Sequence, residues 1–356
     1  MMPKIHVLIV DDAVVVRSRL SKLLALDPEL EVAGVAATGR IALAKIQQVK
    51  PDVVILDVEM PEMDGLETLA AIRQSYPDLP VIMFSTQTQT GATATLDALA
   101  LGASDYATKP SQIGNVQAAN QYIQESLFPK IKFFGRKTAL PLVVPVAPAE
   151  SQSLQRIRDR QAIVEILAIG VSTGGPNALG QLLPQLPKTF PIPIVIVQHM
   201  PPMFTKLMAD RLATKCELCV AEAYPGAPLM PGTIWIAPGD YHLEVTRSGA
   251  RMQLATHQAA PENFCRPSVD VLFRSIAQHC NARSLGVILT GMGQDGLRGC
   301  ESIRDAGGQI LAQDEASSVV WGMPGFVVNA GLADAVLPLE AMSIEILRRV
   351  TNSEHL

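Results

Sequence analysis

Short runs of apolar residues alternate with longer amphipathic stretches along most of this 356-residue chain. A short, continuous apolar run is typical of a strand buried on both faces, and apolar residues spaced three or four positions apart are typical of a helix. Strands and helices that alternate in this way predict a parallel sheet with helices on both faces. The pattern therefore predicts an α/β fold, in which ligands bind at the carboxyl ends of the strands.

The alternation occurs twice, before and after a segment of different composition. In the first part we expect strands near residues 5–10, 31–36, 53–57, 81–84 and 104–107, and helices near 14–26, 40–47, 66–75, 92–101 and 113–127. In the second part we expect strands near 164–169, 192–197, 233–237, 285–289 and 309–312, and helices near 177–185, 203–215, 269–280, 296–306 and 339–349. A hairpin at residues 242–256, with its turn at Ser248-Gly249, interrupts the second series.

Proline and polar residues set the middle of the chain apart. Pro141, Pro145 and Pro148 follow one another closely, and residues 150–160 are mostly polar or charged. Such a composition is typical of a linker that proline stiffens. A chain of this length is also too long for one ordinary hydrophobic core. We therefore expect a first domain at residues 1–125, a linker at 126–162 and a second domain at 163–356.

Charge and cysteine content argue against several classes of protein. The net charge of −5 and the pI near 5.7, with no cluster of Lys and Arg, argue against a nucleic-acid-binding surface. No apolar run is long enough to span a bilayer, so we expect no membrane insertion and a cytoplasmic location. Five cysteines do not suggest a disulfide framework in a chain of this size. Cys216 and Cys219 have the spacing of a zinc knuckle, but no second pair follows, so zinc there is the less favoured alternative.

Acidic residues follow two strands of the first domain. Asp11 and Asp12 come directly after the first strand, and Asp57 ends the third. These strand ends are neighbours in a sheet of the usual order, so the three carboxylates share one pocket and repel one another. A hard divalent cation such as Mg²⁺ relieves that repulsion, and Lys109, after the fifth strand, adds a further positive charge. Strand-end acids can also be solvated or cap helices, but the combination with Ser85 and Lys109 favours the cation site.

The second domain carries a glycine-rich turn around a serine. Residues 170–174 read Gly-Val-Ser-Thr-Gly, follow the first strand of that domain and precede a helix opened by Pro176. In a G-x-S-x-G elbow the glycines allow a sharp turn, which projects the Ser172 hydroxyl above the sheet edge. Backbone N–H groups at Thr173 and its neighbours suit a developing oxyanion. A phosphate- or dinucleotide-binding turn is an open alternative for so short a motif.

A serine nucleophile needs a general base and an orienting carboxylate. His199 follows the next strand and is the best-placed base, while His242 and His257, at the borders of the hairpin, are reserve candidates. Asp295 lies in a glycine-rich loop after the strand at 285–289, which favours it as the third member, although a lone Asp there more often caps a helix. The order Ser, His, Asp differs from the order Ser, Asp, His of α/β-hydrolases.

Residues 1 to about 125 resemble a response-regulator receiver domain. The resemblance implies a flavodoxin-like fold in which Asp57 is the phosphorylation site and a chemotaxis histidine kinase is the phosphodonor. It implies that Mg²⁺ is held by Asp11, Asp12 and Asp57, and that the receiver switch residues are Ser85, Tyr106 and Lys109. An aspartyl phosphate adds charge and acceptor oxygens that draw in a hydroxyl and an ammonium group, and so biases a two-state surface.

Several motifs of the second domain are similar to those of the chemotaxis protein-glutamate methylesterase family, CheB. They are Ser172-Thr173-Gly174-Gly175, Gln198-His199-Met200, Ala237-Pro238-Gly239, Arg266-Pro267-Ser268-Val269-Asp270 and Gly291-Met292-Gly293-Gln294-Asp295-Gly296. With the receiver in front, the resemblance spans nearly the whole chain apart from the linker. It implies two doubly wound parallel-sheet domains, a flavodoxin-like receiver and a Rossmann-like methylesterase domain with a β-hairpin.

The same resemblance implies an enzyme that hydrolyses glutamate methyl esters on the cytoplasmic part of methyl-accepting chemotaxis receptors and releases methanol. Many members also deamidate receptor glutamines. The implied roles are nucleophile for Ser172, general base and then acid for His199, orienting carboxylate for Asp295, and oxyanion hole for Thr173 and Met292. Ester hydrolysis by such a triad needs no metal, so we expect Mg²⁺ in the receiver only.

Further residues and rival functions follow from the resemblance. Arg266, Pro267, Ser268 and Asp270 are expected to shape the substrate cleft, with a structural helix start as the alternative.

A methylesterase-like protein that acts on another substrate, or as a signalling scaffold, is the rival interpretation. A DNA-binding output is disfavoured because no helix-turn-helix or basic face is found. The proline-bearing tether suggests that the unphosphorylated receiver covers the Ser172 rim and that phosphorylation relieves this inhibition.

Overall fold

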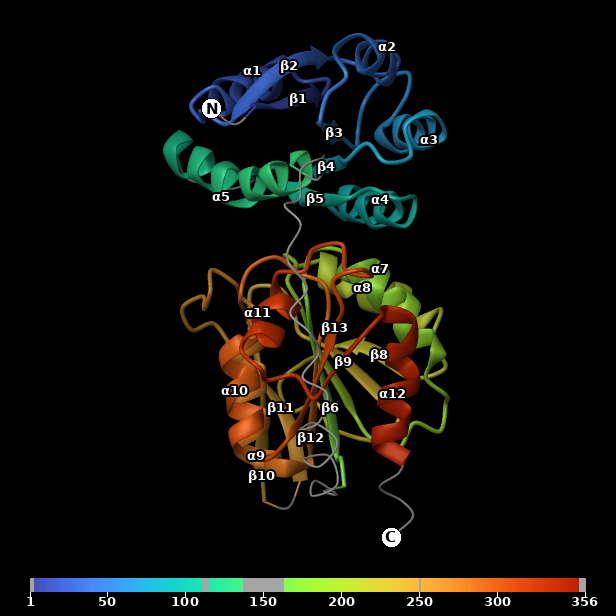
Figure 1. Ribbon diagram of the computed structural model, residues 1–356, viewed down its shortest axis with the longest axis vertical. Coiled ribbons are helices and arrows are strands. Elements are labelled where there is room, and N and C mark those ends of the chain that lie inside the picture. The colour runs from blue at the N-terminus through green and yellow to red at the C-terminus, as the bar shows by residue number, and fades with distance from the viewer. Residues whose placement is uncertain (1–2, 111–114, 137–162, 250, 352–356) are drawn as a thin grey trace. The chain divides into compact units, whose positions relative to one another are not determined.

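The computed structural model describes residues 3–110, 115–136, 163–249 and 251–351. The chain divides into two compact units, Met1–Pro145 and Val146–Leu356. In each unit the described residues form a parallel sheet with flanking helices (Figure 1). Most of the predicted linker, residues 137–162, lies outside the described residues.

The first unit alternates strands and helices, as the apolar pattern predicts. Its elements are β1 (Ile5–Val10), α1 (Val14–Leu24), β2 (Leu30–Ala36), α2 (Gly39–Val49), β3 (Val53–Asp57), α3 (Gly65–Ser75), β4 (Val81–Ser85), α4 (Gln89–Ala100), β5 (Asp105–Thr108) and α5 (Val116–Gly135). Every residue of β3, β4 and β5 is buried, and β1 exposes only His6, because helices cover both faces of the sheet.

The sheet of the first unit has the strand order β2-β1-β3-β4-β5, with all neighbours parallel. This is the doubly wound, flavodoxin-like order, so the predicted fold class is confirmed for this unit. Val10, the last residue of β1, pairs with Leu56 of β3. The acids that follow β1 and end β3 therefore meet at the same edge of the sheet.

The last helix of the first unit is longer than the sequence analysis predicts. α5 continues to Gly135, whereas residues 126–162 were expected to form the linker. The buried face of α5 continues through Ile131 and Phe134, and this helical spacing of apolar residues sustains the helix across Pro129. The start of the expected linker therefore belongs to this helix.

The second unit has more elements than the first and includes two short 3₁₀ helices. They are β6 (Ile166–Val171), α7 (Gly175–Leu182), η1 (Leu183–Gln185), β7 (Ile194–Gln198), α8 (Phe204–Ala213), β8 (Cys219–Glu222), β9 (Thr233–Ile236), β10 (His242–Ser248), β11 (Arg251–His257), α9 (Val269–Cys280), η2 (Asn281–Arg283), β12 (Ser284–Ile288), α10 (Leu297–Asp305), β13 (Gln309–Gln313), α11 (Met323–Asn329), β14 (Ala335–Leu337) and α12 (Leu339–Thr351). The predicted hairpin is present as the antiparallel pair β10 and β11.

The main sheet of the second unit has the order β14-β13-β12-β6-β7-β9-β8 and is parallel throughout. From the central strand β6 the chain builds β7, β8 and β9 on one side, and then crosses back to build β12, β13 and β14 on the other. Ligands of doubly wound sheets bind at such a switch point, outside the carboxyl ends of the strands. The predicted Rossmann-like class is confirmed, and the switch point lies between β6 and β12.

Some short elements of the second unit were not predicted. β8 and β14 lie at the two edges of the sheet and contain no fully buried residue, so their apolar signal is weak. α11 has 7 residues and begins Met-Pro-Gly. Proline and glycine lower helix propensity, so packing rather than local sequence decides this helix.

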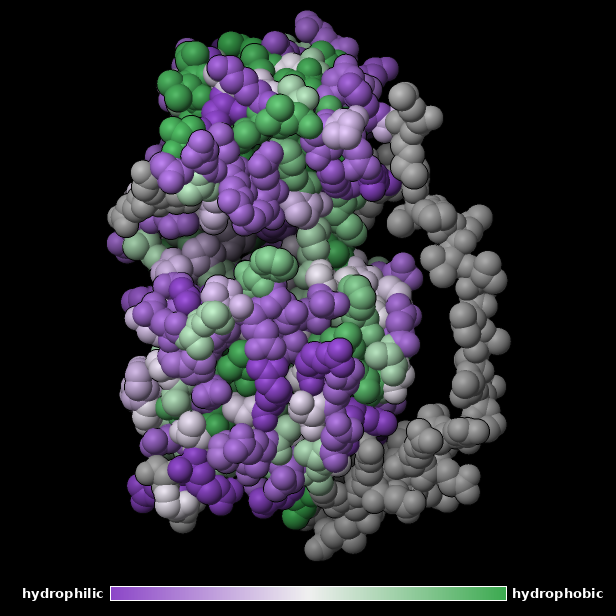
Figure 2. Space-filling view, turned by 90° about the vertical axis from the view of Figure 1, so that its left-hand side faces the viewer, coloured by the Kyte–Doolittle hydropathy of each residue, from purple (hydrophilic) through white to green (hydrophobic). Residues whose placement is uncertain are grey.

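Polar residues predominate on the face of the second unit drawn in Figure 2, and apolar residues appear there in small groups. Such a mixture is ordinary for exposed protein surface.

Across the parts of the chain that the structure describes, no helix is both long and apolar enough to cross a membrane.

Candidate active site

Strand ends bring Ser172, His199 and Asp295 to one edge of the second sheet. The register pairs Val171, the last residue of β6, with Gln198, the last residue of β7. Ser172 and His199 are therefore the next residues of adjacent strands. On the other side of β6, the loop that follows β12 leads to Asp295. The three predicted triad residues thus lie at one sheet edge although they are far apart in sequence.

The serine turn is held by the loop after β12. The Ser172 N–H donates to the Thr290 carbonyl at 3.0 Å, and the Thr290 hydroxyl donates to the Thr173 carbonyl at 2.9 Å. Gly174 has a φ of 80°, a left-handed conformation that lets the chain turn directly into α7. Gly291 lies so close that a Cβ added there would be 2.9 Å from Ser172 Cβ. The turn therefore fixes the half-buried Ser172 at the strand edge.

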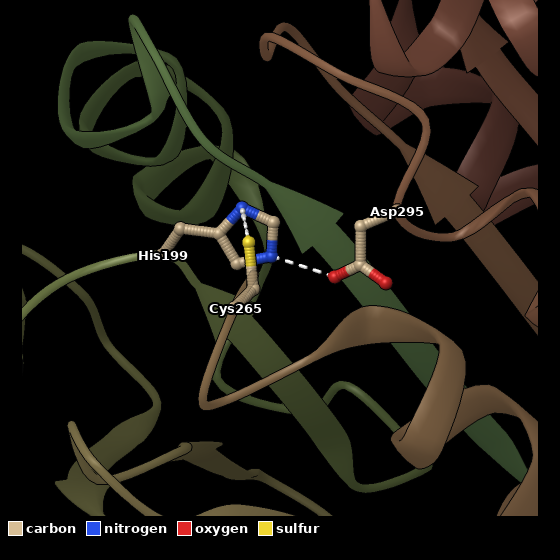
Figure 3. Close-up of side chains that lie close together, drawn as sticks. All are labelled: His199, Cys265 and Asp295. Atoms are coloured by element: carbon tan, nitrogen blue, oxygen red, sulfur yellow. Dashed lines mark hydrogen bonds and ion pairs between the residues drawn. The ribbon is translucent and has the colours of Figure 1, made fainter. Parts of the chain in front are cut away.

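The imidazole of His199 contacts a carboxylate through one nitrogen and a thiol through the other (Figure 3). Nε2 lies 2.7 Å from Asp295 Oδ2, and Nδ1 lies 3.6 Å from Cys265 Sγ. Because Asp295 is an acceptor when ionised, Nε2 carries the proton of this hydrogen bond and Nδ1 is the nitrogen that can act as a base. Among the described residues, no hydrogen bond joins the Ser172 hydroxyl to the ring.

The Asp295 carboxylate lies at the start of α9 and is surrounded by donors. It accepts hydrogen bonds from His199 Nε2 (2.7 Å), Val269 N (2.7 Å), Ser268 Oγ (2.8 Å), Asn263 Nδ2 (3.0 Å) and Asp270 N (3.2 Å). Burial by itself raises the pKa of a carboxylate, but the His199 contact and the other donors outweigh burial and lower the pKa of Asp295 to about 2. Asp295 is therefore ionised at neutral pH, as an orienting carboxylate must be.

Cys265 lies in this site although the sequence analysis gave it no role. It closes a tight turn with Glu262, and the two residues exchange backbone hydrogen bonds of 2.8 and 3.1 Å. Asn263 and Phe264, at the centre of the turn, have positive φ angles of 52° and 62°. The Asn263 amide also donates to the Asp295 carboxylate, so the turn is anchored to the site. A single cysteine in a loop carries no sequence signal for such a contact.

Neighbouring negative charge shifts the pKa of His199. Burial opposes a charged ring, but the contacts with Cys265 and Asp295 outweigh burial and raise the pKa of His199 to about 10. If His199 is the general base, it has to be unprotonated at Nδ1 before it can accept the proton of Ser172.

Ser268 and Asp270, predicted to shape a substrate cleft, are buried supports of the site instead. The Ser268 hydroxyl donates to Asp295, and Asp270 accepts hydrogen bonds from Gly296 N at 3.0 Å and Gly299 N at 2.6 Å. Asp270 thereby holds the loop that carries Asp295 against the start of α9. The alternative of a structural helix start describes both residues, because neither is exposed to a ligand.

Arg266 and Pro267 lie in the same segment but differ in exposure. Arg266 is half-buried and forms an ion pair with Asp240, to which its Nε donates at 3.0 Å. Pro267 is buried. A cleft role stays a prediction for both residues.

The predicted oxyanion residues lie on the two loops that hold Ser172. Thr173 is buried, and Met292 is half-buried in the loop after β12. In the part of the chain that the structure describes, the Met292 N–H donates no hydrogen bond. Its position next to Gly291, which packs on Ser172, is compatible with binding a substrate oxygen, and the oxyanion role stays a prediction.

The reserve histidines occupy the hairpin. The rings of His242 and His257 have centroids 5.3 Å apart. His242 Nε2 lies 3.0 Å from the Ala260 carbonyl oxygen, and His257 Nε2 lies 3.5 Å from a Glu244 oxygen. Within the described ranges neither ring bonds to a triad residue, which leaves His199 as the best candidate base.

The acidic pocket of the first unit contains the predicted phosphorylation residues. Carboxylate oxygens of Asp11, Asp12 and Asp57 lie within 4.8 Å of one another. Lys109 Nζ lies 2.8 Å from Asp11 Oδ2 and 2.7 Å from Asp57 Oδ2. Burial raises the pKa of Asp57 and the charge of Asp11 adds to this, while Lys109 opposes it, with a result of about 6. A donor set of oxygens only, with excess negative charge, fits a hard cation such as Mg²⁺.

The predicted switch residues Ser85 and Tyr106 are both buried in the first unit. The Ser85 hydroxyl donates to the Gly91 carbonyl at 3.0 Å, near the start of α4. Lys130 Nζ lies 5.2 Å from the centre of the Tyr106 ring, and the Lys130 ammonium donates to the Tyr106 carbonyl at 2.7 Å. Both residues therefore contact other parts of the first unit in this structure, and their switch roles stay predictions.

Comparison with known protein families agrees with this pair of sites. A family model described as CheB methylesterase matches residues 167–346, and one described as response regulator receiver domain matches residues 7–121. The chain belongs to the CheB methylesterase family. The predicted family resemblance is thereby confirmed for both halves of the chain.

Individual members of the CheB family are similar over nearly the whole chain. A protein-glutamate methylesterase/protein-glutamine glutaminase of Trichodesmium erythraeum (strain IMS101) is 55% identical over 98% of this chain and 100% of its own length. A protein of the same name from Nocardioides sp. (strain ATCC BAA-499 / JS614) is 50% identical over 98% of this chain and 96% of its own length. The crystal structure of the Thermotoga maritima CheB methylesterase catalytic domain is 42% identical and covers 52% of this chain and 98% of that one, with a TM-score of 0.51.

In this CheB family member some residues support the site although the sequence analysis assigned them no role. Gln198 Nε2 donates to the backbone carbonyls of Ser172 at 3.0 Å and His199 at 3.3 Å, and so ties the two strand ends together. Asn263 joins the triad carboxylate to Asp270. Gln198 could have been suspected because it precedes His199 within a family motif, whereas Asn263 lies outside every motif.

Proposed function

We propose that the protein is a phosphorylation-regulated hydrolase of glutamate methyl esters on the cytoplasmic part of methyl-accepting chemotaxis receptors. The observation that carries this proposal is the meeting of Ser172, His199 and Asp295 at one sheet edge, with His199 Nε2 2.7 Å from Asp295 Oδ2. Relatives that are 55% and 50% identical are named protein-glutamate methylesterases, which supports the same substrate class.

The proposed acylation uses Nδ1 of His199 as the base. The Ser172 hydroxyl oxygen attacks the ester carbonyl carbon while its proton passes to Nδ1. The bond to the methoxy oxygen then breaks, that oxygen takes the proton from Nδ1, and methanol leaves an acyl serine behind. In this structure Cys265 Sγ lies 3.6 Å from Nδ1. Nδ1 must therefore give up this contact and form a hydrogen bond with the Ser172 hydroxyl before the reaction.

Deacylation repeats the same steps with water. His199 takes one proton from the attacking water and returns it to Ser172, and the glutamic acid product loses the other proton to solvent to leave the carboxylate. Backbone N–H groups at Thr173 and Met292 would bind the developing oxyanion in both halves of the reaction. The same machinery would deamidate glutamine with ammonia as the leaving group, and the names of the relatives include this glutaminase activity.

Asp57 is the proposed phosphoacceptor, with a chemotaxis histidine kinase as donor. Asp11, Asp12 and Asp57 would hold Mg²⁺, which supplies positive charge opposite the phosphoryl oxygens. Lys109 already contacts Asp57 and is placed to bind a phosphoryl oxygen. Ser85 and Tyr106 would respond to the new charge, and the unphosphorylated receiver would restrain the methylesterase domain until then.

The triad is tested by following volatile label released from methyl-labelled receptor membranes. Ser172→Ala should reduce release to background while Asp57 phosphorylation persists, and Ser302→Ala on α10 serves as the matched control. Continued release by Ser172→Ala would contradict the proposal and would point to Cys265, the thiol in contact with His199. Release from a small methyl ester but not from receptors would favour the rival substrate.

Regulation is tested separately on the full chain. Methanol release is compared without a phosphodonor, with a phosphodonor and Mg²⁺, and with both in an Asp57→Asn variant. We expect the phosphodonor to raise the rate in the wild-type chain only. Equal rates in all three would remove the regulatory proposal and leave the hydrolytic one intact.

A further inference from the structure

The methylesterase site contains a set of metal-binding donors of mixed type. One ring nitrogen of His199, the sulfur of Cys265 and one carboxylate oxygen of Asp295 lie within 4.8 Å of one another. Among the described residues, the corresponding cluster around Asp57 consists of carboxylate oxygens. Thiolate and imidazole suit zinc and other thiophilic metals, whereas carboxylates suit Mg²⁺. The two clusters should therefore select different cations.

The distance between nitrogen and sulfur, though not yet the direction from the ring to the sulfur, matches that of a metal site. A tetrahedral zinc ion, with Zn–S near 2.3 Å and Zn–N near 2.0–2.1 Å, holds its sulfur and nitrogen ligands about 3.6 Å apart. His199 Nδ1 and Cys265 Sγ are 3.6 Å apart. Figure 3 shows the sulfur over the ring near Nδ1, so the Cys265 side chain has to move toward the ring plane for both atoms to bind one ion.

Asp295 is better suited to orient the ring than to bind an ion. Its oxygens already accept hydrogen bonds from the ring, from Ser268 and from the backbone at the start of α9. Metal-binding histidines commonly donate their other N–H to a carboxylate, which fixes the ring orientation. The contact between His199 Nε2 and Asp295 Oδ2 has this arrangement, which leaves Nδ1 as the metal-binding nitrogen.

We propose that His199 Nδ1 and Cys265 Sγ bind Zn²⁺ or another thiophilic divalent ion, and that the bound ion blocks ester hydrolysis. On binding, the His199–Cys265 pair releases one proton to solvent, and the sulfur binds as a thiolate. Water fills the remaining positions of the ion. Nδ1 then cannot take the proton of Ser172, so the chemical step stops. The block rests on the proposed hydrolytic function, whereas binding of the ion does not.

Access and rigidity favour this site. Neither Cys265 nor His199 is fully buried, and the His199 side chain keeps 12% of its surface exposed. The turn between Glu262 and Cys265 is closed by backbone hydrogen bonds at both ends, and Asn263 anchors it to Asp295. The sulfur is therefore held near Nδ1 without loss of much chain freedom when the ion binds.

The block is tested with Zn²⁺ titrations of methanol release by the full chain, in a buffer without thiols or chelators. We expect Zn²⁺ to lower the rate of the wild type and of Cys219→Ser, a control at an exposed thiol, with the same half-inhibiting concentration. EDTA should restore the rate. Cys265→Ser and Cys265→Ala, each compared with its own metal-free rate, should need at least roughly tenfold more Zn²⁺.

Binding is tested without activity by using Co²⁺ as a spectroscopic probe in a Ser172→Ala background. A cobalt–thiolate charge-transfer band should appear, and it should be lost when Cys265→Ser is added but kept when Cys219→Ser is added. The oxygen-only pocket of the receiver cannot produce this band. A band that persists in Cys265→Ser, or Zn²⁺ inhibition equal in Cys265→Ser and wild type, would overturn the proposal. If no variant hydrolyses esters, the cobalt experiment still decides the metal site.

Discussion

Two buried aspartates, each at the carboxyl edge of one of the two sheets, have pKa values that are shifted in opposite directions. Asp57 and Asp295 both lie at the carboxyl edge of a parallel sheet, and both are almost fully buried. The pKa of Asp57 is raised to about 6, mainly because it is buried and then because Asp11 repels its charge. The pKa of Asp295 is lowered to about 2, because hydrogen-bond donors outweigh its burial.

The difference shows that burial alone does not decide whether a carboxylate at a sheet edge is ionised. Asp57 is opposed by a neighbouring acid and balanced by Lys109, so its pocket still favours an incoming cation. Asp295 accepts hydrogen bonds from the start of α9 and from side chains, so its charge is satisfied within the protein. The first arrangement suits reversible modification, and the second suits a permanent structural charge.

The largest expected effect comes from neutralising each aspartate in turn. Asp295→Asn should lower kcat for ester hydrolysis about ten-thousandfold, because the ring loses its orienting carboxylate. Phosphorylation of Asp57 should be unchanged in that variant. Asp57→Asn should show the reverse pattern, with no phosphorylation and an unchanged unstimulated rate. Label release and phosphoprotein formation, measured on both variants, check this prediction. Loss of phosphorylation in Asp295→Asn, or loss of the unstimulated hydrolysis in Asp57→Asn, would show that the two reactions are not independent.

The second largest effect should come from removal of Mg²⁺, which should affect phosphorylation of Asp57 but not ester hydrolysis. We expect a chelator to reduce phosphorylation of Asp57 from a small phosphodonor to background, since Asp11, Asp12 and Asp57 then repel the incoming phosphoryl group, with Lys109 as the cation that contacts Asp57 in the described structure. Unstimulated hydrolysis should not fall under the same conditions. A parallel loss of hydrolysis would show that the methylesterase site also depends on a metal.

Packing around Ser172 predicts a smaller effect. Gly291→Ala should place a Cβ against Met323 Sδ and 2.9 Å from Ser172 Cβ. Such overpacking costs about 1–3 kcal/mol in free energy of unfolding, and here it should also lower kcat by displacing the nucleophile. Gly180→Ala is the matched control, because nothing lies within 4 Å of its added Cβ in α7, and alanine there should stabilise by up to ~1 kcal/mol.

Denaturant midpoints and kcat for the two glycine variants check this prediction. Equal activity in Gly291→Ala and wild type would mean that the loop after β12 can move away from Ser172. Destabilisation by Gly180→Ala would mean that α7 is packed more tightly than the described structure indicates.

The smallest expected effect is a shift in pH dependence. The unprotonated ring is the active base, and neighbouring charge raises the pKa of His199, so kcat/KM should rise with pH and reach half its maximum above 6.5. Cys265→Ser removes the sulfur contact that helps to raise the pKa of His199, so the midpoint should move to lower pH and the rate at neutral pH should increase. A pH–rate profile of both proteins checks the sign, and an unchanged midpoint would mean that Cys265 does not contribute to the shift.

Most of the fold follows from local sequence because its strands are continuous apolar runs. The bounds of β1, β3 and α9 agree with prediction at every residue. The edge strand β8 was missed because its residues alternate between exposed and partly buried. α5 was predicted too short because the proline-rich and polar composition beyond it was taken to begin before Gly135. Strand-end positions and then family motifs predicted Ser172, His199 and Asp295 as a triad, and the β6–β7 register explains why the first two lie at adjacent strand ends.

The sequence by itself determined the two parallel sheets, the family and the polar residues at the strand ends, because apolar periodicity and short motifs are local properties. Only the tertiary structure decided which nitrogen of His199 faces Asp295, that Cys265 lies 3.6 Å from the other nitrogen, and that Ser268 and Asp270 support the carboxylate. These features depend on turns and side-chain directions at loops that come together from distant parts of the chain. No local pattern encodes such distances, because they are fixed by the packing of the whole sheet edge.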